Sequence, residues 1–142
     1  MAHVSLITLG VADLERATRF YEEMGWHRSS ASVDGTVTFL RGGAVVLSLF
    51  GRQELATDAG VPPCGGGGAT VALAVNLASE DLVDDTLAAA QRAGGRITKA
   101  AERAEWGGYS GYFADLDGHL WEVAHNPGFG LLPDGRVQLP DE

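Results

Sequence analysis

The sequence predicts an α+β protein built from two similar modules, each running strand, amphipathic helix and then three short strands. In each half a strand-like run precedes a stripe of apolar residues at helical spacing, and a glycine-rich stretch lies between the halves. A module of this size does not bury its own apolar face. We therefore expect the two modules to share one domain of 142 residues.

The first module is predicted over residues 4–50. A β-rich run at 4–11 is followed by Asp13, a favoured helix N-cap residue, and by a helix that ends at Gly25. Two-residue turn signals then separate three further strands, predicted at 26–33, 36–40 and 44–50.

Residues 51–68 break this pattern with two prolines and four consecutive glycines, and we predict a linker there. The second module, over 69–125, repeats a strand and then a helix that opens at Ser79. Its remaining strands are predicted at 96–98, 109–114 and 119–124, with a turn at 117–118. The tail at 126–142 is expected to wrap a surface without adding to the core.

The composition and charge of the chain indicate which kinds of molecule it is expected to bind. The net charge is −9, and the acidic residues are scattered over helix starts and turns, which disfavours nucleic acid and anionic membranes as partners. A neutral or cationic small molecule fits better. The single cysteine, Cys64, excludes an intrachain disulfide. The first residues do not read as a secretion signal and no apolar run has spanning length, so we expect a cytoplasmic protein.

Two motifs carry a family resemblance. The first is Leu-Gly-Val-Ala-Asp-Leu at 9–14 with Arg-Phe-Tyr at 19–21, and the second is Gly-Tyr-Phe at 111–113 with Asp-Leu-Asp-Gly-His-Leu-Trp-Glu at 115–122. The chain resembles, over about residues 4–125, the vicinal oxygen chelate superfamily of glyoxalase I, extradiol dioxygenases, fosfomycin-resistance thiol transferases and bleomycin-binding proteins. The resemblance implies that each module curls its sheet into a half-barrel. It also implies a ligand in the open concave face, and a homodimer.

The resemblance also implies where metal-using relatives place four ligands, one on the first and one on the last strand of each module. Here these positions fall on Leu6, Ser48, Thr70 and Glu122. Only Glu122 is of a ligand type, and leucine, serine and threonine do not complete a divalent site. We therefore predict no metal and no other cofactor, which disfavours glyoxalase I and dioxygenase activity. His27 leaves a noncanonical metal open, because the sequence does not determine which way it faces.

Period-two alternation puts Leu120, Glu122 and Ala124 on one face of the last strand, with Trp121 and Val123 toward the helix. Ser110 and Tyr112 match ligand-facing positions in the fosfomycin-resistance relatives. The predicted ligand-binding residues are Leu6, Thr8, Ser48, Phe50, Thr70, Ser110, Tyr112 and Glu122. These residues predict a mainly apolar pocket with a few hydroxyls and one acid.

Three functions stay open. The first is a metal-independent binding protein that sequesters an apolar, aromatic or cationic compound. The second is a metal-free isomerase, epimerase or lyase that uses Glu122 as general acid or base, with Tyr112 or Ser110 polarising a substrate oxygen. A metal-dependent lyase or dioxygenase is the least favoured. Glu122 also has a plain alternative, in which nearby hydroxyls or water satisfy it and it has no catalytic duty.

Aromatic residues around the glycines at 107, 108 and 111 have two interpretations. Trp106, Tyr109 and Tyr112 either stack on a flat ligand together or pack into a core or dimer interface.

Overall fold

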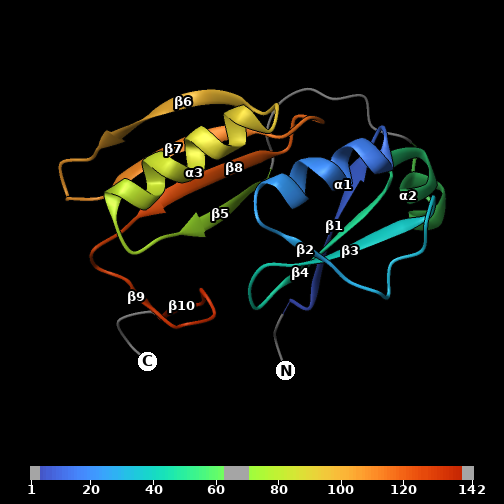
Figure 1. Ribbon diagram of the computed structural model, residues 1–142, viewed down its shortest axis with the longest axis horizontal. Coiled ribbons are helices and arrows are strands. Elements are labelled where there is room, and N and C mark those ends of the chain that lie inside the picture. The colour runs from blue at the N-terminus through green and yellow to red at the C-terminus, as the bar shows by residue number, and fades with distance from the viewer. Residues whose placement is uncertain (1–3, 63–70, 139–142) are drawn as a thin grey trace. The chain divides into compact units, whose positions relative to one another are not determined.

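The computed structural model describes residues 4–62 and 71–138, which fall into two compact units divided after residue 68 (Figure 1). Each unit contains a four-stranded sheet and a helix that packs on it. The predicted α+β class is therefore confirmed.

Unit 1 follows the predicted order of a strand, a helix and three strands. Its sheet has the order β1-β4-β3-β2, in which β1 runs parallel to β4 and the other neighbours are antiparallel. The elements are β1 (Leu6–Val11), α1 (Leu14–Glu23), β2 (His27–Arg28), β3 (Val37–Arg41) and β4 (Val46–Gly51).

Helix α1 begins and ends where the sequence predicts. Asp13 is its N-cap and accepts a hydrogen bond from the Arg16 backbone N–H at 3.1 Å, and Gly25 follows the last turn with a φ of 103°. The helix buries Ala17, Thr18, Phe20 and Tyr21, and it packs on β2, β3 and β4, whose buried residues are Thr38, Leu40, Leu47, Ser48 and Leu49.

Two predictions for unit 1 are wrong in detail. Part of the predicted linker forms a helix, α2 (Arg52–Ala59), which packs on β1 and β4. This helix has almost no stripe of apolar residues, so the spacing of apolar residues does not predict it. In the structure Ala56 is buried and the Leu55 side chain lies close to Gly10. The strand predicted at 26–33 is only two residues long, and Val33 adds an isolated bridge to Val37.

Unit 2 repeats this arrangement with the sheet order β5-β8-β7-β6, and β5 runs parallel to β8. Its elements are β5 (Ala72–Asn76), α3 (Glu80–Arg92), β6 (Arg96–Arg103), β7 (Tyr109–Ala114) and β8 (Leu120–His125). The tail adds a separate hairpin, β9 (Gly130–Leu131) and β10 (Val137–Gln138).

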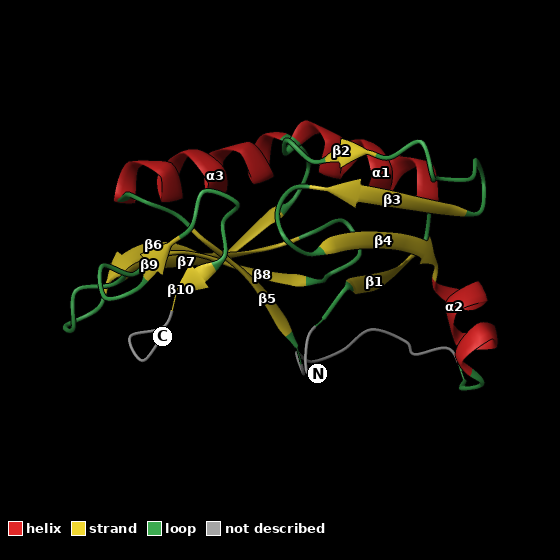
Figure 2. Cartoon of the chain, turned by 90° about the horizontal axis from the view of Figure 1, so that it is seen from below, coloured by secondary structure: helices red, strands yellow, loops and turns green. Residues whose placement is uncertain are grey.

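Helix α3 opens at Ser79, whose hydroxyl accepts a hydrogen bond from the Leu82 N–H at 3.2 Å, and it covers β6, β7 and β8. Its buried residues Val83, Leu87 and Ala90 face a sheet core that includes Val123 and the stacked rings of Phe113 and Trp121, 6.1 Å apart. In both units the helix lies on one side of its sheet (Figure 2).

Gly111 makes this packing possible in unit 2. A Cβ atom at Gly111 would lie 2.8 Å from the Leu87 side chain and 3.0 Å from the backbone of both Lys99 and Ala101. Any side chain here would push α3 or β6 away from β7.

We expect Gly111→Ala to lower the free energy of unfolding by about 1–3 kcal/mol, because the added methyl group meets backbone that cannot move aside. Gly128→Ala is the control, since a Cβ there meets only the Asn126 side chain. Urea unfolding followed by circular dichroism measures both variants. A Gly111→Ala midpoint equal to that of the parent would contradict this packing.

Candidate functional site

Each sheet has a second face, which its own long helix does not cover. We call this the open face; it carries the residues that alternate with the buried, helix-facing ones. In β1, Leu9 and Val11 are buried while Leu6 and Thr8 are exposed.

The open face of unit 1 holds all four residues predicted from its strands. Thr8 pairs with Ser48 on β4, and Ser48 pairs in turn with Phe39 on β3. Leu6 pairs with Val46, and Phe50 lies two residues beyond Ser48. Leu6 is 48% exposed although it is a large apolar side chain, whereas Ser48 is only 5% exposed. This face is apolar with two hydroxyl groups, those of Thr8 and Ser48.

Helix α2 occupies one end of this open face. Its Arg52 Cβ and Leu55 Cδ2 lie 3.1 and 3.2 Å from where a Cβ of Gly10 would be, and Gly10 shares its face with Leu6 and Thr8. Figure 2 shows α2 on the side of the sheet opposite α1. The missed helix therefore limits the open face beyond Phe50 and Gly10.

The open face of unit 2 brings Glu122 and Tyr112 side by side. Strand pairing places Ala74, Glu122, Tyr112 and Lys99 in one row across β5, β8, β7 and β6. Directly opposed residues of neighbouring strands share a face, so a carboxylate, a phenol and an ammonium group are consecutive neighbours in this row. Glu122 thus has a methyl group on one side and a hydroxyl donor on the other.

The charged groups of this row affect the pKa of the Tyr112 phenol. The negative charge of Glu122 raises the pKa of Tyr112, with partial burial adding to the shift and the positive charge of Lys99 opposing it. The Lys99 ammonium also lies 3.2 Å from the Glu102 carboxylate. Tyr112 is therefore a neutral hydrogen-bond donor at physiological pH.

Ser110 lies on the same face one step along, where it pairs with Ala124 on β8 and with Glu102 on β6. Thr70 lies outside the described residues, as do Cys64 and the glycine run at 65–68. The spacing along the chain shows which residue of β5 corresponds to Leu6 of β1. Ala72 precedes the N-cap Ser79 by seven residues, and Leu6 precedes the N-cap Asp13 by the same number.

This equivalence extends to the partner strands, since Leu6 pairs with Val46, two residues before Ser48, and Ala72 pairs with Leu120, two residues before Glu122. By internal symmetry the counterpart of Leu6 is Ala72. Neither residue binds a metal.

The donor set does not fit a divalent metal. Of the described positions that correspond to the family's ligands, only Glu122 has a donor that divalent ions favour. Within 4–62 and 71–138, no three His, Cys, Asp or Glu side chains are grouped to hold a metal ion. His27 pairs with Arg41, which places it at the edge of the unit 1 open face beside a cation.

The histidines and the other aromatic residues considered in the sequence analysis are not part of this row. His119 donates or accepts a 2.7 Å hydrogen bond with the buried Asp115, and His125 contacts the Leu77 carbonyl oxygen at 2.9 Å. Tyr109 donates to Asp84 of α3 at 2.6 Å, so it lies on the helix side, opposite Tyr112. Trp106 is 69% exposed in the β6–β7 turn. The interpretation in which the three aromatics stack together on one ligand is therefore wrong.

Lys99 is the residue that sequence reasoning missed. The strand was predicted to end at Thr98, but β6 continues to Arg103 through register shifts on either side of Lys99. These irregularities break the alternation that would have shown which way Lys99 faces. The β6–β7 hairpin gives no signal either, because an unbroken register from the pair Arg103 and Tyr109 would place Lys99 opposite Phe113, and only the register shift brings it opposite Tyr112.

The class of protein follows from this geometry: two βαβββ units, each with an open sheet face lined by few polar groups. The sequence profile of the Glyoxalase/Bleomycin resistance protein/Dioxygenase superfamily matches residues 1–123. The chain belongs to this superfamily.

Solved structures of similar proteins have the same fold. The chain is similar to a glyoxalase-related enzyme from Fulvimarina pelagi, with 36% identity and a TM-score of 0.89 over 98% of this chain and 99% of the other. It shares its fold with a lactoylglutathione lyase from Agrobacterium tumefaciens, at 22% identity and a TM-score of 0.67, over 89% and 95% of the two chains. No protein of curated function matches.

No helix in the described parts of the chain combines the length and the apolar character needed to cross a bilayer.

The row on the second open face predicts a measurable coupling. In Glu122→Gln the pKa of Tyr112 should fall toward its ordinary value, because the negative charge that disfavours the phenolate is gone while Lys99 still favours it. NMR of the ring carbons of labelled tyrosine, titrated through alkaline pH, measures this shift.

Asp84→Asn is the matched control, since Asp84 raises the pKa of Tyr109 and lies on the helix side of the sheet. It should lower the pKa of Tyr109 and leave that of Tyr112 unchanged. An unchanged Tyr112 titration in Glu122→Gln would show that the two groups are not coupled.

Proposed function

We propose that this chain is a small-molecule binding protein that uses the open sheet faces without a protein-held metal, as a homodimer, and that it sequesters a compound with an apolar or aromatic body and a cationic group. The observation that carries the proposal is the row of Ala74, Glu122, Tyr112 and Lys99. It offers the Glu122 carboxylate for a cation and the Tyr112 phenol as a donor, beside the small side chain of Ala74.

The burial and donor types support binding over metal chemistry. Taken by itself, the open face of unit 1 has apolar area from Leu6, Phe39 and Phe50, and the open face of unit 2 has Leu120 beside Glu122; burying apolar area is the main source of small-molecule affinity. The residues at the family's described ligand positions contribute a single carboxylate. A carboxylate that does not hold a metal is free to attract a cationic ligand.

The charge balance also favours a cation. The net charge of −9 raises the local concentration of cations around the molecule. Lys99 moderates this attraction at one end of the row, but Glu102 lies 3.2 Å from its ammonium group. A cation placed over Glu122 and Ala74 is separated from Lys99 by the width of the Tyr112 strand.

Acid–base catalysis is a second candidate, and the neutral phenol of Tyr112 beside Glu122 favours it. In such a reaction Glu122 takes a proton from a substrate carbon, while Tyr112 donates a hydrogen bond to the adjoining carbonyl oxygen. The similar protein from Fulvimarina pelagi is described as an enzyme, which is consistent with this alternative.

A binding experiment tests the proposal. Glu122→Gln should weaken benzyltrimethylammonium binding by about 1–2 kcal/mol, roughly fivefold to thirtyfold, because the carboxylate charge is lost while the shape is kept. Isothermal titration calorimetry measures it, with neutral benzyl alcohol as the comparison compound.

Asp85→Asn is the matched control, because it removes the same charge from an exposed site on α3. Equal affinity of the parent and Glu122→Gln for benzyltrimethylammonium would show that the Glu122 carboxylate is not part of the binding site.

Native mass spectrometry with elemental analysis of protein purified without chelator tests the other two parts of the proposal, the homodimer and the absence of a protein-held metal. A monomer, or one divalent metal per subunit, would contradict the corresponding part of the proposal.

Catalysis has its own readout. Carbonyl metabolites incubated with the protein in D2O should exchange a carbon-bound proton only if the second candidate is correct, and Glu122→Gln should abolish the exchange while benzyl alcohol binding persists.

A further inference from the structure

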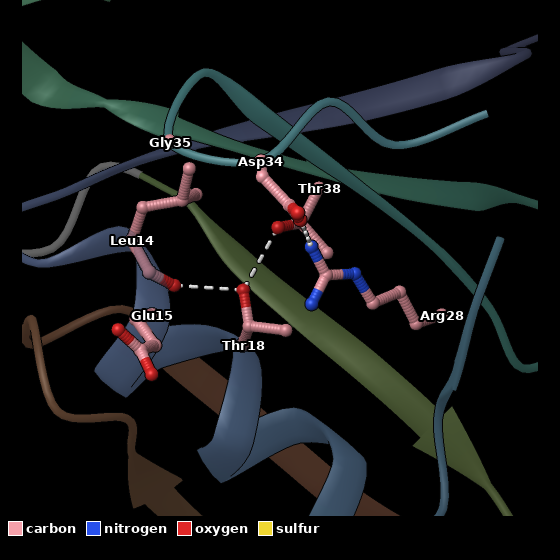
Figure 3. A pocket seen from close by; sticks show the side chains of 7 residues that line it. All are labelled: Leu14, Glu15, Thr18, Arg28, Asp34, Gly35 and Thr38. Atoms are coloured by element: carbon pink, nitrogen blue, oxygen red, sulfur yellow. Dashed lines mark hydrogen bonds and ion pairs between the residues drawn. The ribbon is translucent and has the colours of Figure 1, made fainter. Parts of the chain in front are cut away.

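A separate cavity lies in unit 1 between the start of α1 and the β2–β3 turn (Figure 3). Its volume is about 340 Å³, at the lower end of the range of small-molecule sites. Thr38, which lines it, faces α1, whereas the open face of the same sheet carries Phe39. Of the predicted ligand-binding residues that the structure describes, none lines this cavity.

Two buried threonines give the cavity a floor that accepts hydrogen bonds. Thr18 and Thr38 are 3% and 2% exposed, and their hydroxyl oxygens lie 2.8 Å apart. The Thr18 hydroxyl donates to the Leu14 carbonyl oxygen at 2.7 Å, so Thr38 donates to Thr18. Both hydroxyl hydrogens are engaged, and only oxygen lone pairs are left for a ligand.

The rim of the cavity is negative. Arg28 and Asp34 form an ion pair with a nitrogen–oxygen distance of 2.6 Å, which neutralises both charges, and Glu15 adds a carboxylate from the first turn of α1. These three side chains sum to one negative charge. An anion would meet two carboxylates and a guanidinium group that already has a partner.

We propose that this cavity binds a primary alkylammonium group. An ammonium group has three N–H donors and no acceptor, which matches a floor that only accepts. Glu15 supplies the opposite charge, and Leu14 lines the cavity with an apolar side chain for the alkyl chain. The cavity is lined by residues of unit 1 and shares none with the row at Glu122 in unit 2, so this proposal does not depend on the function proposed above.

The first test is an NMR titration of the ¹⁵N-labelled full chain with n-butylammonium chloride at constant ionic strength. The amide signals of Thr18, Gly35 and Thr38 should shift with a dissociation constant on the order of 1–10 mM, as expected for so small a ligand. Tetramethylammonium has the charge without N–H donors, and n-butanol has the chain without the charge. Both compounds should bind at least about tenfold more weakly than n-butylammonium.

Two variants should act in opposite directions. Glu15→Gln removes the attracting charge and should weaken n-butylammonium binding about threefold, whereas Arg28→Gln removes the positive charge that is paired with the Asp34 carboxylate and should strengthen it about threefold. Both side chains lie at the rim, so folding should persist. Glu23→Gln, at the far end of the same helix, is the matched control and should leave the affinity unchanged.

Glu122→Gln should also leave the dissociation constant unchanged, which separates this site from the open face. Shifts confined to Tyr112 and Glu122, affinities that Glu15→Gln and Arg28→Gln do not change, or equal binding of n-butylammonium and tetramethylammonium would each overturn the proposal.

Discussion

One covering helix for each four-stranded sheet is the constraint on which the rest of this structure depends. A sheet has two faces, and α1 or α3 buries only one of them within its own unit. Buried residues therefore alternate with less buried ones along β1, β3 and β8. The residues that alternate with the core are released from packing, and these are the positions where a ligand-binding surface can develop.

Features that repeat with the period of the pleat or the helix are readable from sequence, because one residue's direction determines the next. The alternation around Glu122 is predictable for this reason, whereas Asp13 and Gly25 are predictable from the residue types that favour the two ends of a helix. Helix α2 was missed because a helix of eight residues held mainly by Ala56 and Leu55 has almost no apolar stripe. Lys99 was missed because a register irregularity interrupts the alternation on which such predictions rest.

The cavity beside α1 illustrates another limit of sequence reasoning. Thr18 sits where the helix period requires a buried residue, and Thr38 sits where the strand period requires one. Each alone is simply a tolerated polar core residue. Only the pairing of the two hydroxyls, 2.8 Å apart, shows that both hydrogens are engaged and that the surface beside them accepts but does not donate.

The two units put their polar groups to different uses, although they share one topology. In unit 2 the central position of β8 is a carboxylate with a phenol beside it, whereas the equivalent position of β4 is Ser48, which is buried next to Phe39. Burying a charged group in that environment would cost far more free energy than burying the hydroxyl group of serine. Serine at this position of unit 1 therefore suits an apolar face, whereas Glu122 gives the corresponding position of unit 2 a charged group. The same row position therefore carries a carboxylate beside a phenol in unit 2, at Glu122 and Tyr112, and a hydroxyl beside an aromatic ring in unit 1, at Ser48 and Phe39.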